Sequence, residues 1–225
     1  MGERPHYIGH RQRLKERFAS HPEALPDYEL LELILCQALP RRDVKPLAKA
    51  LIKRFGGFAE VVSAERDRLM EVDGVGDSAA TSIKLVQESV LRFMKAQVIN
   101  RPVISSWTSL LDYCRASMGF NKREQFRVLY LDRKNRLIAD EVGQEGTVDH
   151  TPVYPREVVK RALELGSSAV ILVHNHPSGD PTPSREDVTM TQEIVEAGRK
   201  LGIQVHDHII ISKGAHASFK ALGLI

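Results

Sequence analysis

A short polar segment contains the residues of this sequence that are best suited to chemistry: His174, His176 and Asp187. The apolar run 169–173 comes directly before it and predicts a buried strand. Side chains two residues apart on a strand point to the same side, so the two imidazoles could bind one ion. The Pro- and Gly-rich residues 177–183 predict a stiff loop, after which Asp187 lies in the first turn of a helix. Two histidines and one carboxylate, with a free fourth position, are the ligands of a hydrolytic zinc site.

Each of these residues also has an ordinary structural explanation. A His-x-His pair on a strand can be half-exposed and without function. Ser184 and Asp187 form the Ser-x-x-Asp pattern of a helix capping box, and we expect that a ligand aspartate could not also serve fully as the cap. The strand-end histidines, the loop and the Ser-x-x-Asp pattern occur together at this spacing. The combination favours the metal site and predicts one Zn2+ ion per chain.

The complete segment 174–187 resembles a known family of enzymes. Its pattern, His-x-His followed by seven residues and Ser-x-x-Asp, is that of the JAMM (MPN-type) zinc metalloproteases. Its form, His-Asn-His-Pro-Ser-Gly-Asp-Pro-x-Pro-Ser-x-x-Asp, is similar to the version in bacterial RadC-like proteins. The resemblance implies that His174, His176 and Asp187 bind zinc. It also implies that Ser184 helps to orient water and stabilise the oxyanion, and that the domain is a mixed sheet with flanking helices, similar to cytidine deaminases.

The same resemblance implies a glutamate on an early strand that serves as general acid and base. Glu124 is our candidate, because the segment 123–126 is similar to the Arg-Glu-x-Phe of RadC-like proteins and opens a predicted strand. A carboxylate beside the attacking water can take its proton and later give it to the leaving amine. An isolated glutamate at a strand end is more often simply solvated. Glu141 and Glu145, which follow the second strand of a predicted hairpin, are rivals for the role.

Helical and strand patterns alternate in the second half of the chain, which predicts an α/β (α+β) domain over 103–225. The expected strands cover 126–131, 136–142, 169–173 and 203–211, and the expected helices cover 107–118, 155–165 and 184–201. The last strand contains His206-Asp207-His208, in which alternation places the two histidines on one face and Asp207 on the other. Asp207 could support a metal-bound histidine or be a structural partner within the sheet, and the sequence leaves both open.

The first half of the chain, 1–99, is predicted to be a small all-helical domain. Its expected helices cover 27–39, 44–55, 58–63, 66–71 and 77–94. The turn at 72–76 resembles a helix-hairpin-helix turn, in which Gly74 and Gly76 would let the backbone approach a DNA phosphate. The same pattern also occurs in ordinary tight turns, and Asp73 and Asp77 would oppose a phosphate. DNA is therefore one possible partner of this half.

The composition is ordinary for a globular protein. Of 225 residues, 42% are hydrophobic and 27% are charged, and the net charge of +3 neither requires nor excludes nucleic acid. No apolar run is long enough for a membrane span, and the start does not resemble a signal peptide. The two cysteines, Cys36 and Cys114, are expected to be reduced core residues. These features indicate a cytoplasmic protein that does not bind membranes.

Two functions from different classes fit these features. The first is a zinc-dependent hydrolase of peptide or isopeptide-like amide bonds, whose substrate the sequence does not name. The second is a DNA-associated binding protein, linked to DNA repair by the label that RadC-like proteins carry, with a structural or vestigial zinc site. A metal-dependent nuclease of the HNH type is a weaker third hypothesis, because the Pro-rich loop and the Ser-x-x-Asp pattern argue against it.

Overall fold

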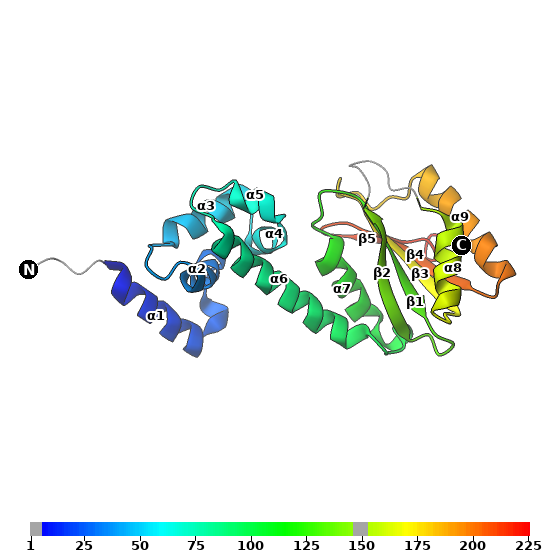
Figure 1. The fold of residues 1–225 in the computed structure, drawn as a ribbon, viewed down its shortest axis with the longest axis horizontal. Helices are drawn as coiled ribbons and strands as arrows, with labels where there is room; N and C mark the ends of the chain where they lie inside the picture. The colour runs from blue at the N-terminus through cyan, green and yellow to red at the C-terminus, as the bar shows by residue number, and fades with distance from the viewer. Residues whose placement is uncertain (1–5, 146–152) are drawn as a thin grey trace, which may run out of the picture. The chain divides into compact units, whose positions relative to one another are not determined.

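The structure of the protein is a computed structural model that describes residues 6–145 and 153–225. The chain forms two compact units, with Val90 the last residue of the first and Leu91 the first residue of the second. Helix α6 (Asp77–Val98) contains this boundary and can be followed in Figure 1. Each unit has its own cluster of buried hydrophobic side chains, as expected of a compact folding unit.

The first unit consists of short helices around one core. In chain order they are α1 (His6–Ser20), the 3-10 helix η1 (Pro22–Ala24), α2 (Asp27–Ala38), α3 (Lys45–Phe55), α4 (Phe58–Ser63), α5 (Arg66–Met70) and the first part of α6. The core side chains are mainly leucine, valine and alanine, and Leu31, Leu51 and Val61 are completely buried. Helix α3 ends at Phe55 and is capped by Gly56, whose φ of 110° is a left-handed conformation that glycine adopts without strain. The predicted helical first half is confirmed.

The second unit contains a five-stranded mixed sheet. After the last part of α6, its elements are η2 (Val103–Ser106), α7 (Trp107–Met118), β1 (Gln125–Leu131), β2 (Leu137–Glu145), α8 (Pro155–Glu164), β3 (Ala169–Asn175), α9 (Arg185–Lys200), β4 (Gln204–Ile211) and β5 (His216–Ser218). The strand order is β2-β1-β3-β4-β5. Strands β3 and β4 are parallel and are connected through α9, and the other neighbouring pairs are antiparallel. The predicted mixed sheet with flanking helices is confirmed.

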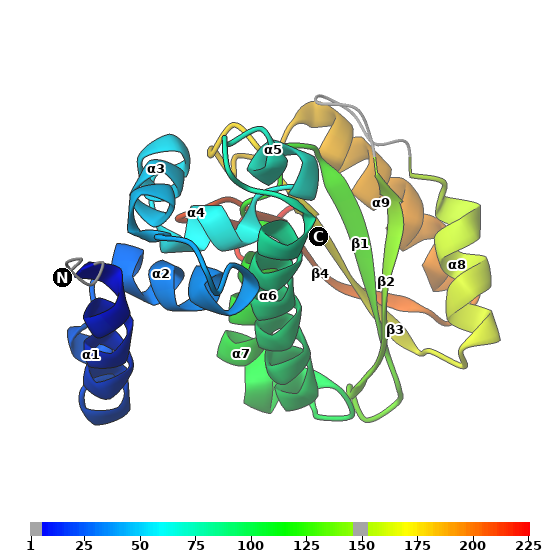
Figure 2. The same ribbon diagram turned by 60° about the vertical axis from the view of Figure 1, so that its left-hand side comes forward.

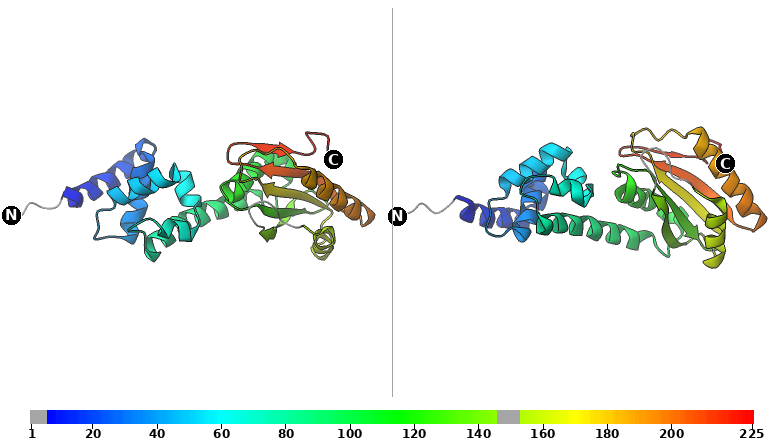
Figure 3. Two further views of the ribbon diagram at one scale, coloured as in Figure 1. Left: turned by 90° about the horizontal axis from the view of Figure 1, so that it is seen from above. Right: turned by 45° about the horizontal axis from the view of Figure 1, so that its top comes forward.

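Helices cover both faces of this sheet, as Figures 1 and 2 show. On one face, Leu129 and Ile171 pack in a cluster with residues of α7, such as Cys114. On the other face, Val128 and Leu172 pack with residues of α8 and α9. Because both faces are covered, all residues of β1 and β3 are buried. Figure 3 shows the same layers from two further directions.

The ends of the sheet differ from the sequence prediction. Strand β2 runs past the predicted end at 142 and is still opposite β1 at Glu145, which pairs with Gln125. The short strand β5 was not predicted, because three residues are too few to carry an alternating pattern. It pairs with the end of β4 and completes the sheet on that side.

Cys36 and Cys114 are both buried and free, and burial raises the pKa of both thiols, that of Cys114 to about 12. They therefore have the environment of unreactive core residues. Within residues 6–145 and 153–225, no helix combines the length and the apolar character that crossing a membrane requires.

Candidate metal centre

The three candidate ligands lie where β3 ends and α9 begins. His174 and Asn175 are the last residues of β3, His176 follows the strand directly, and Asp187 lies in the first turn of α9. The chain passes from β3 to the parallel strand β4 through α9. In such units the carboxyl end of a strand and the start of the next helix lie at the same edge of the sheet. The topology therefore brings the two histidines and the aspartate together.

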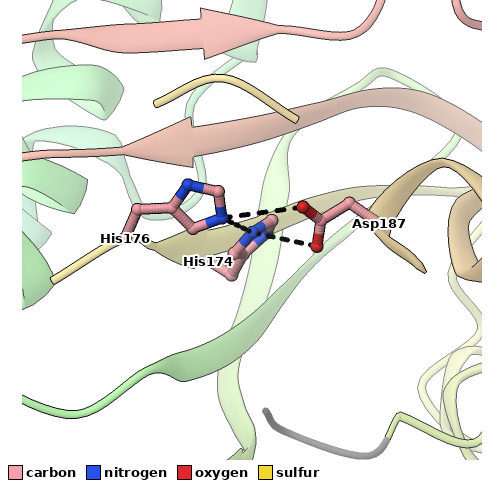
Figure 4. Close-up of side chains that lie close together, drawn as sticks. All are labelled: His174, His176 and Asp187. Carbon is pink, nitrogen blue, oxygen red and sulfur yellow. Dashed lines mark hydrogen bonds and ion pairs between the residues drawn. The ribbon is translucent and has the colours of Figure 1, made fainter. Parts of the chain in front are cut away.

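The side chains of His174, His176 and Asp187 point toward one another (Figure 4). The Nε2 atoms of the two imidazoles are 2.9 Å apart. Nε2 of His174 is 3.2 Å from Oδ1 of Asp187, and Nε2 of His176 is 3.6 Å from Oδ2. One ligand atom from each residue lies within 4.8 Å of the others. His174 and Asp187 are buried and His176 is half-buried, so solvent reaches the cluster at His176.

The donor set of this cluster fits a divalent metal ion such as zinc. Nδ1 of His176 is 2.8 Å from the backbone oxygen of Asp180, and because a carbonyl can only accept, Nδ1 carries the hydrogen. The lone pair of the neutral His176 ring is therefore on Nε2, the atom that faces the cluster. Two imidazole nitrogens and a carboxylate are ligands that zinc prefers. A cation among them would stabilise the close approach of these acceptor groups.

Asp187 serves the helix cap and faces the histidines at the same time. Its Oδ2 accepts from the backbone N–H of Ser184 at 2.8 Å and from the Ser184 hydroxyl at 2.7 Å. Oγ of Ser184 accepts in return from the N–H of Asp187 at 3.1 Å, which completes a capping box. The complete capping box still leaves Asp187 facing the histidines. The reason is that Oδ1 does not take part in the cap and is left to face His174.

The protonation states of His174 and Asp187 favour a metal ion near neutral pH. Burial lowers the pKa of His174 to about 4, so this ring is neutral. A hydrogen bond with Asp187 raises the pKa of His176 above its ordinary value. Burial alone would raise the pKa of Asp187, but the hydrogen bond with His176, the nearby His174 and the hydrogen bonds from Ser184 outweigh burial and lower it. A metal ion therefore meets a neutral imidazole and an ionised carboxylate, and competes with a proton at His176.

Glu124 lies beside His176, directly before β1. In the antiparallel pairing of β1 and β3, Phe126 is opposite His174, which makes position 124 level with position 176 just beyond the strand ends. Besides the hydrogen bond with Asp187, which is the main cause, the negative charge of Glu124 contributes to the raised pKa of His176. The half-buried Glu124 is therefore at the same edge of the sheet as the candidate ligands.

The two rival glutamates lie on β2, which is separated from β3 by β1. Glu141 is opposite Val128, and its carboxylate is paired with the guanidinium of Arg161 at 2.6 Å. The hydrogen bond from Arg161 outweighs burial and lowers the pKa of Glu141, which favours its ionised form. Glu145 is opposite Gln125 at the end of β2. Both rivals are thus one strand farther from the candidate ligands than Glu124 is.

Asn175, between the two histidines, was not predicted as part of the site. Its Oδ1 accepts from the N–H of Gln125 at 2.9 Å, and its Nδ2 donates to the carbonyl of Arg123 at 3.1 Å. Both of these backbone groups flank Glu124. Asn175 is 1% exposed, and a buried amide at the end of an apolar strand needs hydrogen-bond partners. That need is the signal in the sequence that could have pointed to Asn175.

His208 of β4 and Thr191 of α9 form a chain of hydrogen bonds that reaches Nδ1 of His174. Neither residue was predicted to contact the candidate ligands. Nε2 of His208 is 2.7 Å from Nδ1 of His174, and Nδ1 of His208 is 2.6 Å from Oγ1 of Thr191. Asp207, for which two roles were open, instead accepts from the hydroxyl of Ser218 at 2.6 Å. Its contacts are those of a structural partner that connects β4 with β5.

The prediction that His206 and His208 share a face of the sheet is wrong. At this point, consecutive residues of β3 have partners two residues apart in β4, so His206 is the extra residue of a β-bulge. Nε2 of His206 is 2.7 Å from Oδ1 of Asn135, and His206 lines a cavity with Trp107 of α7. His208 instead faces α9. The alternation of residue types does not reveal such a bulge, because it assumes an uninterrupted strand.

Gly74 and Gly76 lie in the turn between α5 and α6, in the first unit. Gly74 has a φ of 89°, in the left-handed region, and Nη1 of Arg42 donates to its carbonyl at 3.3 Å. A Cβ at Gly74 would meet the guanidinium of Arg42, whereas a Cβ at Gly76 would meet open space. Asp77, which was expected to oppose a phosphate, forms an ion pair with Arg66. The turn therefore depends on glycine and has two arginines beside it.

A model of the RadC-like JAB domain matches residues 104–224. The match spans more than half of the 225 residues and includes the sheet, Glu124, Ser184 and the three candidate ligands. The resemblance inferred from the segment 174–187 is thereby confirmed. The second unit, with its five-stranded mixed sheet and its His-His-Asp cluster, identifies the chain as a member of the RadC-like JAB domain family, of the JAB/MPN type.

Proposed function

We propose that this protein is a zinc-dependent hydrolase of amide bonds, of the peptide or isopeptide type. The observation that carries the proposal is the convergence of two imidazole Nε2 atoms and one carboxylate within 4.8 Å at the end of β3. The position of Glu124 next to His176, and the family to which the chain belongs, support the same activity. A carboxylate beside a cluster of metal-ligating side chains is the arrangement that hydrolysis by activated water requires.

In this proposal His174 and His176 bind one zinc ion through Nε2, and Asp187 binds it through its carboxylate. Zinc in a site with three protein ligands lowers the pKa of water to about 7 and polarises a carbonyl group. The capping box keeps Asp187 at the start of α9, because Ser184 holds Oδ2 through its N–H and its hydroxyl. The cap thereby orients the carboxylate toward the histidines before any metal ion binds.

Glu124 is the proposed general base and acid. Its carboxylate takes a proton from the attacking water and gives it to the leaving amine nitrogen, so the scissile C–N bond breaks without release of an amide anion. The hydrogen bonds of Asn175 to the backbone groups on both sides of Glu124 hold its position. Ser184 has a second proposed role: rotation of its hydroxyl away from Asp187 would let it donate to the developing oxyanion.

The test combines metal analysis with a screen for hydrolysis. Purified protein incubated with Zn2+ and then separated from free metal should retain about one ion per chain, and His174→Ala or Asp187→Asn should retain much less. A panel of C-terminally extended peptides and small amides would then be screened for cleavage. Glu124→Gln should keep the metal and lose at least ~100-fold in kcat.

The matched control is Glu141→Gln, which removes a carboxylate from β2 and should leave kcat nearly unchanged. A wild-type chain that binds no Zn2+ would end the proposal.

A second candidate function is DNA binding by the first unit, with the zinc site structural or vestigial. The observation that favours it is the turn at 72–76, where Gly74 is left-handed and Arg42 lies against it. Backbone N–H groups at the start of α6, with arginines nearby, are suited to a phosphate, and such contacts do not depend on base sequence.

The DNA hypothesis can be tested with a substitution that the fold should tolerate. A side chain at Gly76 meets open space, and so does one at Gly214 in the second unit. Gly76→Glu should weaken binding to duplex or branched DNA, while Gly214→Glu should not, and wild-type binding should fall steeply with salt. Equal binding by wild type and Gly76→Glu would exclude this turn as the contact.

A further inference from the structure

Three buried residues form a continuous chain of hydrogen bonds behind the candidate metal centre. The hydroxyl of Thr191 donates to the backbone oxygen of Asp187 at 2.6 Å. Oγ1 of Thr191 is also 2.6 Å from Nδ1 of His208, and Nε2 of His208 is 2.7 Å from Nδ1 of His174. Thr191, His208 and His174 each have an exposed fraction of 0%. Solvent therefore cannot replace any member of the chain.

The direction of each hydrogen bond in this chain follows from the first. A hydroxyl has one hydrogen, and the carbonyl of Asp187 can only accept, so Thr191 uses its hydrogen on that carbonyl. Nδ1 of His208 must then donate to Oγ1 of Thr191. A neutral His208 with its hydrogen on Nδ1 has a lone pair on Nε2, and Nδ1 of His174 must donate to it. The neutral His174 ring is left with its lone pair on Nε2, the atom that faces Asp187 and His176.

We infer that His208 and Thr191 are positioning residues that select the tautomer in which His174 presents the Nε2 lone pair to the metal ion. This inference rests on the metal site of the proposed function. Neither residue touches the ion or the substrate. They act through His174, in the way that outer partners of metal-binding histidines set the tautomer and the ring orientation.

The surroundings of His208 keep its ring in one orientation. The ring of Phe126 meets it edge-on at a centroid distance of 5.9 Å, and the ring of Phe219 lies at 4.5 Å. The two candidate histidine ligands thus have different partners: His176 donates to the backbone oxygen of Asp180, and His174 donates to a side chain from another strand.

The first experiment reads the tautomer directly in metal-free wild-type protein. Two-bond 1H–15N correlation spectra of protein labelled with 15N-histidine distinguish a ring protonated on Nδ1 from one protonated on Nε2. The expected result is that His174 and His208 are both neutral and both protonated on Nδ1. A spectrum in which His174 carries its hydrogen on Nε2 would overturn the inference. This outcome does not depend on any variant or on whether an amide is cleaved.

The second experiment measures Zn2+ affinity by competition with a chromophoric chelator. Thr191→Val keeps the shape of the side chain but removes the hydroxyl, and we expect it to weaken Zn2+ binding by ~10–100-fold and to mix the tautomers of His174. Thr191→Ser restores the hydroxyl and should restore both properties. The matched control is Thr189→Val on the exposed side of α9, because Thr189 makes the same kind of hydroxyl contact with the carbonyl four residues earlier. It should leave affinity and spectrum unchanged.

The outcomes separate this inference from the proposed function. If wild type binds Zn2+ and Thr191→Val binds it equally well with the same tautomer spectrum, the positioning role is wrong and the metal site stands. If wild type binds no Zn2+, the proposed function fails, and the inference fails with it. A folded Thr191→Val, judged by its circular dichroism, is required for the comparison. If it does not fold, His208→Gln is used in its place, with the wild-type spectrum as the independent test.

Discussion

The side-chain amide of Asn175 is hydrogen-bonded to the backbone on both sides of Glu124. It accepts from the N–H of Gln125 at 2.9 Å and donates to the carbonyl of Arg123 at 3.1 Å. The residue between the two candidate histidine ligands thus holds the backbone of the candidate base, which lies directly before a different strand. The position of Glu124 relative to the candidate ligands is therefore held by one buried side chain.

Replacement of Asn175 by alanine should reduce catalysis without removing the metal. Glu124 would lose both anchors of its backbone, and a shift of about 1 Å in a catalytic group can cost ~100-fold in rate. We expect kcat of Asn175→Ala to fall by ~10–100-fold, with Zn2+ still bound at one ion per chain. The measurement is steady-state kinetics together with metal analysis. Wild-type kcat in this variant would show that Asn175 does not position the base.

Ser184→Ala should affect both stability and metal affinity. Loss of an N-cap side chain typically costs about 1 kcal/mol of unfolding free energy. Oδ2 of Asp187 would also lose the hydroxyl that holds it at 2.7 Å, so we expect Zn2+ affinity to fall about 10-fold. Ser184→Thr keeps the hydroxyl and is the matched control. Urea unfolding of the metal-free protein and a Zn2+ competition titration measure the two effects. A loss of stability with unchanged affinity would limit Ser184 to the helix cap.

The metal-free protein should lose stability in mild acid because of its buried histidines. Burial lowers the pKa of His174 to about 4, against about 6.5 in an unfolded chain. Between these values the unfolded chain binds more protons, so the unfolding free energy falls as the pH falls from ~6.5 to ~4, by up to about 3 kcal/mol for this group. His208, whose pKa burial also lowers, changes stability in the same direction.

The contribution of His176 to this profile has the opposite sign and a different pH range. Its pKa is raised by Asp187, so the stability that it adds is complete below ~6.5 and is lost as the pH rises through its folded pKa. Below pH 6.5 the difference in unfolding free energy between wild type and His174→Gln therefore reports the titration of the buried His174 ring. When urea unfolding is measured at a series of pH values, the unfolding free energy of the variant should change less steeply with pH than that of wild type. Parallel profiles would show that His174 does not titrate as a buried group.

The local parts of the site could be predicted from the sequence, because they depend on neighbours within a few residues. His174 and His176 on one strand end, and Ser184 with Asp187 at a helix start, follow from spacing alone. Spacing could not indicate how the two oxygens of Asp187 divide their contacts: Oδ1 faces His174 outside the cap, whereas Oδ2 takes part in the cap and also lies 3.6 Å from Nε2 of His176. That division is a matter of atomic geometry within one carboxylate.

The parts that were missed depend on contacts between distant segments. Thr191 and His208 meet because the register of β3 and β4 brings His208 level with Leu172, on the face covered by α9. The bulge at His206 then sends one histidine to each face, which strict alternation predicts wrongly. Register and bulges are set by the packing of both sheet faces, and a single sequence does not specify them.

A buried cluster of polar side chains contains Arg127, Asp140 and Tyr113. We expect the fold to tolerate replacement of the whole cluster by apolar residues better than the loss of one charged partner. Nη1 of Arg127 donates to Oδ1 and Oδ2 of Asp140, at 2.8 Å each, and the hydroxyl of Tyr113 donates to the same carboxylate. Asp140→Ala would leave the guanidinium buried without the carboxylate of its ion pair, which typically costs ~3–5 kcal/mol. Replacement of all three residues by apolar ones of similar size, Arg127→Met with Asp140→Leu and Tyr113→Phe, removes the buried ion pair and the hydroxyl bonded to it at once. We expect urea unfolding to show that the triple variant is more stable than Asp140→Ala, because an unpaired buried charge costs more than a lost ion pair. A triple variant less stable than Asp140→Ala would contradict this expectation. It would show that the ion pair itself stabilises β1 and β2, and that the cost of an unpaired charge is not the main effect.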